Sequence, residues 1–318
     1  MSVAVVVTVR NEEHTIDELI RSLLAQTRTP DDIVISDGGS TDGTPRVIQR
    51  RIERGAPIRF LACAGANIAA GRNRAIEAAT GDFIACTDAG AWLDPRWLES
   101  IVSPLERGAD VVMGAFRAAP RNTFERALGA ATLPDVGEIK PDRFIPSSRS
   151  IGFTRVAWQQ VGGYPEWLDY CEDVVFDLAL RRAGLRFAWA PAAVAHYRPR
   201  ASVAAYFTQY YRYARGDGKA NLWPRRHLAR YLTYGVAPLV MLAGFWYKGT
   251  WLALGLCAGL YLYRPYRRLI RTLDTIPRRE RLLAVALVPF LRFVGDVAKM
   301  VGYPVGVWWR VRRERANA

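Results

Sequence analysis

The chain has 318 residues, of which half are hydrophobic and 23% are charged, and this composition excludes a disordered or fibrous protein. The formal charge of +14 is uneven: residues 1–197 carry 22 Lys and Arg against 25 Asp and Glu, whereas residues 198–318 carry 22 against 5. Basic residues beside long apolar runs mark a membrane face more often than a nucleic-acid groove, so we expect a membrane partner and no nucleic acid.

The first 120 residues alternate short apolar runs with stretches of helical periodicity. We expect strands at residues 3–9, 33–36, 58–62, 83–87 and 111–116, with helices at 12–26, 41–54, 67–80 and 95–107 between them. Strands that are apolar throughout and alternate with helices indicate a mostly parallel, Rossmann-like sheet with helices on both faces. Polar residues follow nearly every strand, at the edge where ligands of such sheets bind. The predicted fold class is therefore α/β.

The middle of the chain is less regular. Residues 120–150 are rich in Pro, Asp and Arg, which predicts a mobile loop, and an acidic stretch at 169–177 leads into a helix that ends near Gly184. Residues 206–219 predict an aromatic-rich amphipathic helix. The four cysteines lack disulfide or metal spacing, which favours buried free thiols in a reducing compartment, and residues 2–8 read as a strand rather than a secretory signal.

The C-terminal part predicts membrane-associated helices. Apolar runs of 17 and 14 residues, at 231–247 and 250–263, are separated only by Lys248 and Gly249. The first is just long enough to span a bilayer and the second is short of the usual ~20 residues. Basic residues at 198–230 and 264–281 would keep both ends of such a hairpin in the cytoplasm. The alternative is a buried, soluble helical domain.

Residues 282–309 are also apolar but carry three charges, Arg292, Asp296 and Lys299. Offsets of 0, 4 and 7 place these charges on one face of a helix. We therefore expect this segment to lie in the membrane interface or to return through it.

Four short motifs carry the candidate chemistry. They are Arg10-Asn-Glu-Glu13, the Asp- and Gly-rich run Asp37-Gly-Gly-Ser-Thr-Asp-Gly-Thr44, the run Ala70-Gly-Arg-Asn-Arg-Ala75, and Gly81-Asp-Phe-Ile-Ala-Cys-Thr-Asp88. Glycines let a backbone approach a ligand, and a carboxylate can accept from a base or a ribose. Taken singly, the second motif also fits an ordinary turn whose helix is capped by Ser40 or Asp42, and Asp88 also fits a helix cap.

The order and spacing of the four motifs resemble the family 2 glycosyltransferases, which have the GT-A nucleotide-sugar-binding fold, over about residues 3–215. The resemblance implies a nucleotide-sugar-binding half at 1–120, and an acceptor-binding half with the catalytic base and the amphipathic helix at 121–220. A membrane hairpin with basic interfacial helices would follow at 221–318. It implies that Asp37 contacts the nucleotide base and that Glu12 lies near the ribose. The implied donor-binding residues are Thr8, Arg10, Glu12, Asp37, Arg72 and Asp88.

The resemblance also implies a divalent cation, Mg²⁺ or Mn²⁺, at the donor diphosphate. Asp88 matches the first acid of the family's D-x-D pair, and His196 matches a histidine often found beside the diphosphate, so both are candidate metal ligands. The second acid of the pair is replaced by Gly90, which weakens the expected site because hard cations require several oxygens. Alternatively, His196 is satisfied by backbone at a strand end. Asp94 is expected to cap the next helix.

Glu172-Asp173 matches the family's E-D signature, which implies that Asp173 is the general base. An inverting transfer needs a carboxylate to take the proton of the acceptor hydroxyl as it attacks the anomeric carbon. The alternative is that both acids only cap the following helix. Asp177 is expected to face elsewhere on that helix.

Gln209, Arg212 and Tyr213 resemble the Q-x-x-R-W motif of membrane polysaccharide synthases, with Tyr in place of Trp. Their offsets place them on one helical face, and an arginine there could stabilise diphosphate charge. A juxtamembrane helix with interfacial tyrosines explains the same pattern equally well. Arg198 and Arg200 are candidates for binding phosphate or a lipid headgroup.

These observations predict an inverting glycosyltransferase anchored to the inner or plasma membrane, with its catalytic domain in the cytoplasm. It would move a sugar from a nucleoside-diphosphate donor to a lipid-linked acceptor, in the synthesis of envelope polysaccharide or glycolipid. The alternatives are a processive polysaccharide synthase and a catalytically silent membrane scaffold, and a homo-oligomer is left open. The central expectation is that Asp37, Asp88 and Asp173 converge on one cleft.

Overall fold

The computed structural model describes residues 1–317 of the chain. These residues form two compact units. The first unit comprises Met1–Ala119 and Asp135–Arg198, and the second comprises Pro120–Pro134 and the chain from Pro199 onward.

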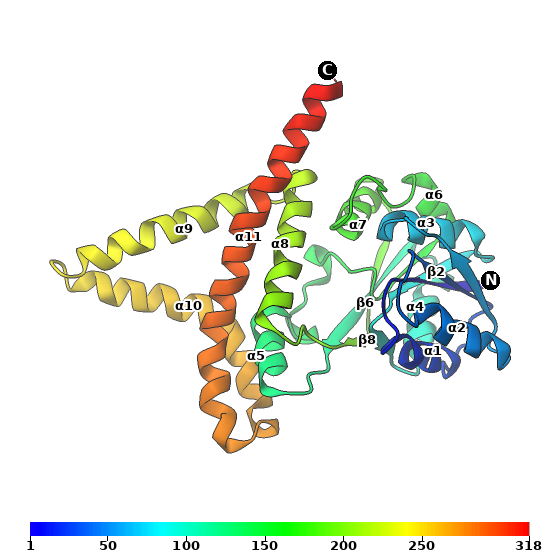
Figure 1. Cartoon of the computed structure of the whole chain (residues 1–318), viewed down its shortest axis with the longest axis horizontal. Coiled ribbons are helices and arrows are strands. Elements are labelled where there is room, and N and C mark those ends of the chain that lie inside the picture. The colour runs from blue at the N-terminus through cyan, green and yellow to red at the C-terminus, as the bar shows by residue number, and fades with distance from the viewer. Residues whose placement is uncertain (318) are drawn as a thin grey trace. The chain divides into compact units, whose positions relative to one another are not determined.

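The first unit, which contains the N-terminus marked in Figure 1, is built on an eight-stranded sheet. The strand order is β3-β2-β1-β4-β7-β6-β8-β5. The strands are β1 (Val3–Val9), β2 (Asp32–Asp37), β3 (Ile58–Ala62), β4 (Phe83–Asp88), β5 (Ala91–Leu93), β6 (Val111–Ala118), β7 (Ile151–Thr154) and β8 (Phe187–Tyr197). The α/β class and the five expected strands are confirmed. The sheet is mixed, however, because β5 and β7 run antiparallel to their neighbours, whereas four of the seven pairings in the described sheet are parallel.

Helices cover both faces of this sheet. They are α1 (Ile16–Leu24), α2 (Thr44–Glu53), α3 (Ile68–Ala78), α4 (Trp97–Glu106), α6 (Arg155–Gln160) and α7 (Glu172–Arg182), with short turns η1 (Val136–Glu138) and η2 (Pro141–Arg143). Along β1, Val5 packs into a core shared with α1 and α4, whereas Val6 packs into a second core shared with α3 and α7. Burial of both faces explains why β1 is apolar throughout.

The expected cap of α2 is wrong in detail. Gly43 is the N-cap residue and makes no side-chain capping bond. Asp42 Oδ1 instead accepts from the Thr44 backbone N–H at 3.0 Å, within the turn that precedes the helix.

The second unit is helical. It contains α5 (Thr123–Thr132), α8 (Val203–Lys219), α9 (Pro224–Ala243), α10 (Gly249–Thr272) and α11 (Arg281–Asn317), with turns η3 (Leu273–Thr275) and η4 (Arg278–Glu280). The expectation of a loop throughout 120–150 is wrong for α5. Asn122 caps this helix by accepting from the Glu125 N–H, and the Glu125 carboxylate accepts in return from the Arg121 N–H. This reciprocal cap is a helix-start signal.

Glycines permit a close contact between α8 and α11. A Cβ added to Gly302 would overlap the carbonyl oxygen of Tyr211, and one added to Gly306 would overlap that of Arg215. Gly218 on α8 similarly faces the Tyr303 carbonyl. Small residues at a helix contact allow the two backbones to approach, as in helix pairs formed within lipid.

The two apolar runs form the antiparallel helices α9 and α10 (yellow in Figure 1). Over residues 1–317, no helix has both the length and the apolar character required to cross a bilayer, so the expected spanning hairpin is not supported. The longer run, of 17 residues, falls below the usual ~20. All four cysteines are free thiols, as expected, although only Cys63 and Cys86 are buried.

Candidate active site

The carboxyl ends of β1, β2 and β4 bring the predicted donor residues to one edge of the sheet. Thr8 on β1 pairs in register with Ser36 on β2 and with Asp88 on β4, and the next residue of β1 pairs with Asp37. Asp37 and Asp88 therefore flank β1. The hydroxyls of Thr8, Ser36 and Thr87 are buried with no hydrogen-bond partner among residues 1–317. Buried polar atoms are normally bonded, so these three hydroxyls leave hydrogen-bonding capacity unused inside the protein.

The loop after β1 is tied to the loop after β2. Asn11, whose φ is 56°, accepts from the Thr41 N–H at 2.8 Å, and its own N–H donates to Ser40 Oγ at 2.8 Å. Ser40 Oγ also donates to Asp37 at 2.6 Å. These bonds fix the Asp37 carboxylate, while Arg10 lies exposed beside it. The positive φ of Asn11 suits the left-handed region that Asn tolerates better than most residues.

Arg72 is the buried link of the site. It lies on α3 and only 1% of its side chain is exposed. Its Nη2 donates to Asp88 Oδ1 at 2.8 Å, and its Nη1 donates to Glu172 Oε1 at 3.0 Å. The guanidinium carbon also lies 4.8 Å from the ring centroid of Tyr164. Arg72 therefore brings the start of α7, with Asp173, beside Asp88.

Burial perturbs the acids at the start of α7. Burial, together with the charge of Asp173, raises the pKa of Glu172 to about 7, although Arg72 opposes the shift. Burial also raises the pKa of Asp173, against the lowering effect of Arg72 and Arg149. Cys171, in a left-handed conformation with φ 63°, is the N-cap residue. Glu172 binds Arg72, so this acid does more than cap the helix, whereas Asp173 Oδ1 accepts from the Val174 backbone N–H at 2.9 Å.

Asp177 lies one helical turn beyond Asp173 and therefore on the same side of α7, so the expectation that it faces elsewhere is wrong. Its side chain is buried, and neither carboxylate oxygen has a hydrogen-bond partner among the described residues. Burial and the charge of Asp173 raise its pKa well above the ordinary value, which favours the protonated form of this carboxyl.

Arg149 belongs to the site, although no sequence motif indicated it. Its Nε lies 3.9 Å from Asp88 Oδ2. Its guanidinium carbon lies 4.6 Å from the ring centroid of Tyr197 and 5.9 Å from that of Phe116. The sequence placed Arg149 in an irregular segment, and no local signal pointed to its approach to Asp88.

His196 is paired with an acid rather than with backbone. Its Nε2 lies 2.7 Å from Asp94 Oδ1, and its ring stacks on Trp92 at 5.5 Å between centroids. The expected role of Asp94 as a helix cap is therefore wrong, because Arg96 is the N-cap residue of α4. Arg198 follows the same strand and its Nη2 donates to Glu18 at 2.9 Å.

The side chains around Asp88 do not fit a divalent cation. One carboxylate oxygen of Asp88 is bound by Arg72 and the other faces Arg149. The second expected ligand, His196, is paired with Asp94. Within residues 1–317, no three His, Cys, Asp or Glu side chains are grouped to hold a metal. Waters and substrate phosphates can supply most of the oxygens around a hard cation, but the two guanidiniums beside the single Asp88 carboxylate repel a positive ion.

Gln209, Arg212 and Tyr213 lie on α8, in the second unit. Gln209 Nε2 donates to the Tyr213 hydroxyl at 2.8 Å, so these two side chains share a helical face as expected. Arg200, which precedes α8, is exposed.

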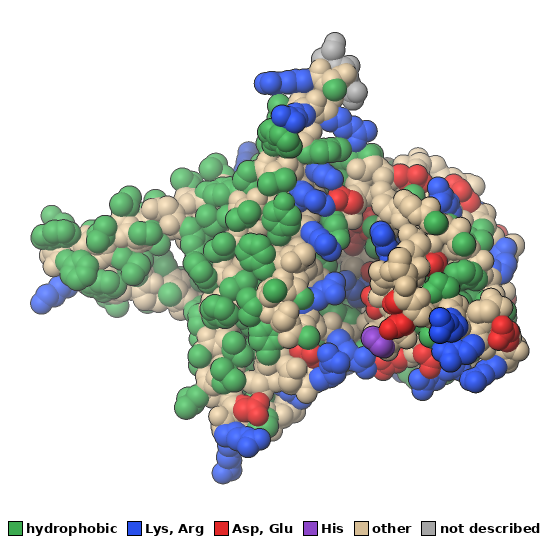
Figure 2. All heavy atoms as spheres, viewed as in Figure 1, with side chains coloured by type: hydrophobic (Ala, Val, Ile, Leu, Met, Phe, Trp, Pro, Cys, Tyr) green, Lys and Arg blue, Asp and Glu red, His purple; other side chains and the backbone are tan. Residues whose placement is uncertain are grey.

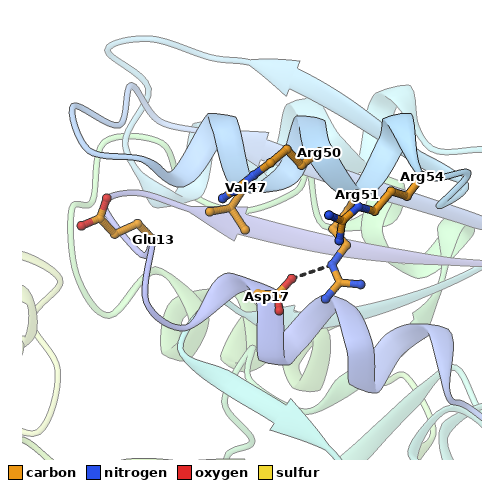
Figure 3. A pocket seen from close by; sticks show the side chains of 6 residues that line it. All are labelled: Glu13, Asp17, Val47, Arg50, Arg51 and Arg54. Atoms are coloured by element: carbon orange, nitrogen blue, oxygen red, sulfur yellow. Dashed lines mark hydrogen bonds and ion pairs between the residues drawn. The ribbon is translucent and has the colours of Figure 1, made fainter.

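A cavity of about 300 Å³ lies between α1 and α2, away from these acids (Figure 3). It is lined by Glu13, Asp17, Val47, Arg50, Arg51 and Arg54. Asp17 on α1 is paired with Arg51 on α2, as the dashed line in Figure 3 shows. None of the predicted donor residues lines this cavity.

Comparison with known proteins places the chain in a family. The model described as "Glycosyl transferase family 2" matches residues 4–160, and the model described as "Glycosyl transferase family group 2" matches residues 84–290. The succinoglycan biosynthesis protein ExoA of Rhizobium meliloti is 29% identical over 286 residues, covering 79% of this chain and 86% of that protein.

A second relative, the glucosyl-dolichyl phosphate glucuronosyltransferase of Haloferax volcanii, is 28% identical over 146 residues, covering 45% of this chain and 42% of that protein. Among solved structures, the mannosyltransferase PcManGT of Pyrobaculum calidifontis, in complex with GDP-Man and Mn²⁺, shares the fold with a TM-score of 0.65 at 20% identity. The match covers 94% of this chain and 86% of that one. Since the second family model spans well over half of its residues, the chain belongs to the family 2 glycosyltransferases.

Proposed function

We propose that this chain is an inverting glycosyltransferase that moves one sugar from a nucleoside-diphosphate donor to a lipid-linked acceptor at the cytoplasmic face of the cell membrane. The observation that carries the proposal is the Arg72 bridge, which sets the candidate base Asp173 beside Asp88. Both lie near the carboxyl ends of parallel strands, where ligands of such sheets bind.

In the proposed transfer, Asp173 takes the proton of the acceptor hydroxyl. The acceptor oxygen forms a bond to the anomeric carbon while the bond from that carbon to the diphosphate breaks. The bonding electrons leave with the diphosphate, and the acceptor proton passes to the Asp173 carboxylate. Attack opposite the leaving group inverts the anomeric centre. A raised pKa makes Asp173 a stronger base than an ordinary aspartate, and such a base typically accelerates transfer by ~10²–10⁴-fold.

The donor would lie along the ends of β1, β2 and β4. We assign Asp37 to the nucleotide base and Glu12 to the ribose, with Thr8 and Arg10 beside them. The strand register, which sets Asp37 and Asp88 on either side of β1, supports a donor at this edge. Arg72 is too buried to be mainly a contact of the donor. We propose that it positions Asp88 and the acids at the start of α7.

The second unit supports a membrane partner because its apolar side chains point outward. Large hydrophobic residues are exposed on α9, α10 and α11 and in the turn between α9 and α10, including Leu260 at 80%, Leu282 at 83% and, in the turn, Phe245 at 75% (green in Figure 2). Meanwhile Asp296 on α11 is buried and accepts from Arg230 Nε at 2.8 Å. Polar groups inside and apolar groups outside suit a lipid environment and argue against a soluble helical domain.

Charge and a relative's name extend this argument to the acceptor. The arginines at 264–281 would attract anionic lipid and favour the cytoplasmic side. The relative from Haloferax volcanii is named for a dolichyl-phosphate-linked substrate. We therefore propose that the second unit lies in the membrane interface and that the acceptor is carried by a lipid.

The experiment uses the purified chain in lipid vesicles with a panel of nucleotide sugars. Transfer to, or hydrolysis with, at least one donor is expected. Asp173→Asn should lower turnover at least ~100-fold and leave donor binding intact. Asp142→Asn, on an exposed turn, is the matched control. Binding of no nucleotide sugar would overturn the proposal, and full activity of Asp173→Asn would overturn the assignment of Asp173 as the general base.

The processive-synthase alternative rests on Gln209, Arg212 and Tyr213. Gel analysis of the product separates the two: we expect addition of a single sugar, whereas a ladder of long products would favour the synthase.

A further inference from the structure

Arg149 lies beside Asp88, but the proposed function above gives it no role. It precedes β7, and its Nε lies 3.9 Å from Asp88 Oδ2, whereas Arg72 binds Asp88 Oδ1, so each oxygen of Asp88 faces a different guanidinium. The rings of Tyr197 and Phe116 lie against the Arg149 guanidinium, and 21% of the side chain remains exposed. A guanidinium held by aromatic rings is oriented in advance, because fewer side-chain conformations are lost when a ligand binds.

The missing second acid cannot simply be restored at its position. Gly90 has a φ of +85°, which side-chain-bearing residues rarely adopt. A Cβ at this position would lie 3.4 Å from Glu12 Oε2. An aspartate at residue 90 would therefore strain the backbone and bring its charge against the Glu12 carboxylate. Asp88 is therefore the single acid of this motif, and its carboxylate is already flanked by Arg72 and Arg149.

We propose that Arg149 binds the diphosphate of the donor, in the place where a divalent cation would otherwise lie beside Asp88. This inference rests on the proposed function. A guanidinium presents parallel N–H donors that match two phosphate oxygens. Its fixed positive charge stabilises the negative charge that grows on the leaving diphosphate as the bond to the sugar breaks. Donor binding and transfer therefore do not require Mg²⁺ or Mn²⁺.

The test measures binding of GDP, UDP, dTDP and ADP to the full-length chain in detergent by calorimetry, with EDTA or with Mn²⁺. The nucleoside without phosphate is the reference for each probe. We expect the dissociation constant of the bound diphosphate to change less than about 3-fold between the two buffers. Arg149→Ala should weaken diphosphate binding by about 10- to 100-fold, as expected for loss of a charge-assisted hydrogen bond, and leave nucleoside binding unchanged.

Matched variants separate this role from a structural one. Arg149→Lys keeps the charge but not the fork, and should retain part of the preference for diphosphate over nucleoside. Arg143→Ala removes an exposed arginine from the same segment and should behave as the wild type. If Arg149 had only a structural role, its replacement would lower the melting temperature. We expect instead that Arg149→Ala melts at the wild-type temperature and loses its preference for diphosphate over nucleoside.

The outcomes distinguish the inference from the proposed function. Diphosphate binding that disappears in EDTA and returns with Mn²⁺ overturns the inference but leaves a glycosyltransferase with a conventional cation. An Arg149→Ala variant that keeps the wild-type preference for diphosphate over nucleoside also overturns the inference and leaves the proposed function standing. If no nucleoside diphosphate binds in either buffer, the proposed function itself fails.

Discussion

Arg72 and Glu172 are 100 residues apart in the chain, yet Arg72 Nη1 donates to Glu172 Oε1 at 3.0 Å inside the protein. The same guanidinium binds Asp88, so one buried cation holds two carboxylates that come from different elements. Removing one partner of a buried ion pair typically costs about 3–5 kcal/mol, because the other charge is left uncompensated.

Arg72→Ala should therefore lower both stability and turnover. We expect a loss of about 3 kcal/mol or more in the unfolding free energy of the first unit. Glu172→Gln should be milder, because its amide oxygen can still accept from Arg72. Thermal melts followed by tryptophan fluorescence and turnover of the same samples provide the measurement. An Arg72→Ala variant as stable as the wild type would show that the bridge is not formed in solution.

The pH dependence of transfer should reflect the raised pKa of Asp173. A general base must be ionised, so kcat/KM is high above its pKa and falls as the pH drops through it. Because burial raises that pKa, the acid limb should lie above the ordinary aspartate value of about 3.9. Glu172 adds a second titration near its pKa of about 7, which Glu172→Gln should remove while the Asp173 limb remains. A profile that is flat down to pH 4 would contradict the assignment of Asp173.

Asp177 should destabilise the protein increasingly as the pH rises. Its folded-state pKa is raised, so the folded protein keeps a proton that the unfolded chain releases above about pH 3.9. The stability linked to this proton is complete below the unfolded pKa and is lost as the pH rises toward the folded one. Asp177→Asn avoids this cost, and its stability relative to the wild type should grow by up to about 1.4 kcal/mol per pH unit. Melting curves at pH 5 and pH 8 test this, and an equal difference at both values would refute it.

The contact between α8 and α11 should tolerate no side chain at its glycines. Gly302→Val places methyl groups against the Tyr211 carbonyl, and overpacking of this kind costs about 1–3 kcal/mol or more. Gly259→Ala on α10 is the control, since no atom lies within 4 Å of its added Cβ, and alanine should stabilise that helix slightly. Limited proteolysis should cut Gly302→Val faster than the wild type, and equal rates for both variants would argue against the close contact.

Much of the sheet could be predicted from the sequence, because strands buried on both faces leave unbroken apolar runs such as Val3–Val9. Shorter pieces gave no such signal: β5 has three residues, and α5 lies within a stretch whose Pro and Arg content suggested a loop. The Asn122 and Glu125 cap of α5 was a usable signal that composition obscured.

Only part of the candidate site could be predicted from the sequence. Motif order placed Asp37 and Asp88 at strand ends, where register pairs both with β1. The Arg72 bridge, the pairing of His196 with Asp94 and the approach of Arg149 to Asp88 join residues far apart in the chain. Such contacts depend on tertiary packing, which no local pattern encodes.

Membrane association should depend on the exposed aromatic residues between α9 and α10. Phe245 and Trp246 are 75% and 74% exposed. Burying such a side chain in lipid contributes about 1.5–3 kcal/mol, so replacing both with Asp should weaken vesicle binding by at least ~100-fold. Leu24→Asp, at an exposed leucine of α1 in the first unit, is the control and should float with vesicles as the wild type does. Comparing flotation with anionic and with neutral vesicles would separate the contribution of the arginines to vesicle binding from that of the apolar residues. Added salt should weaken only the arginine contribution, because salt screens charge. Undiminished flotation of the double variant would show that this hairpin is not the membrane contact.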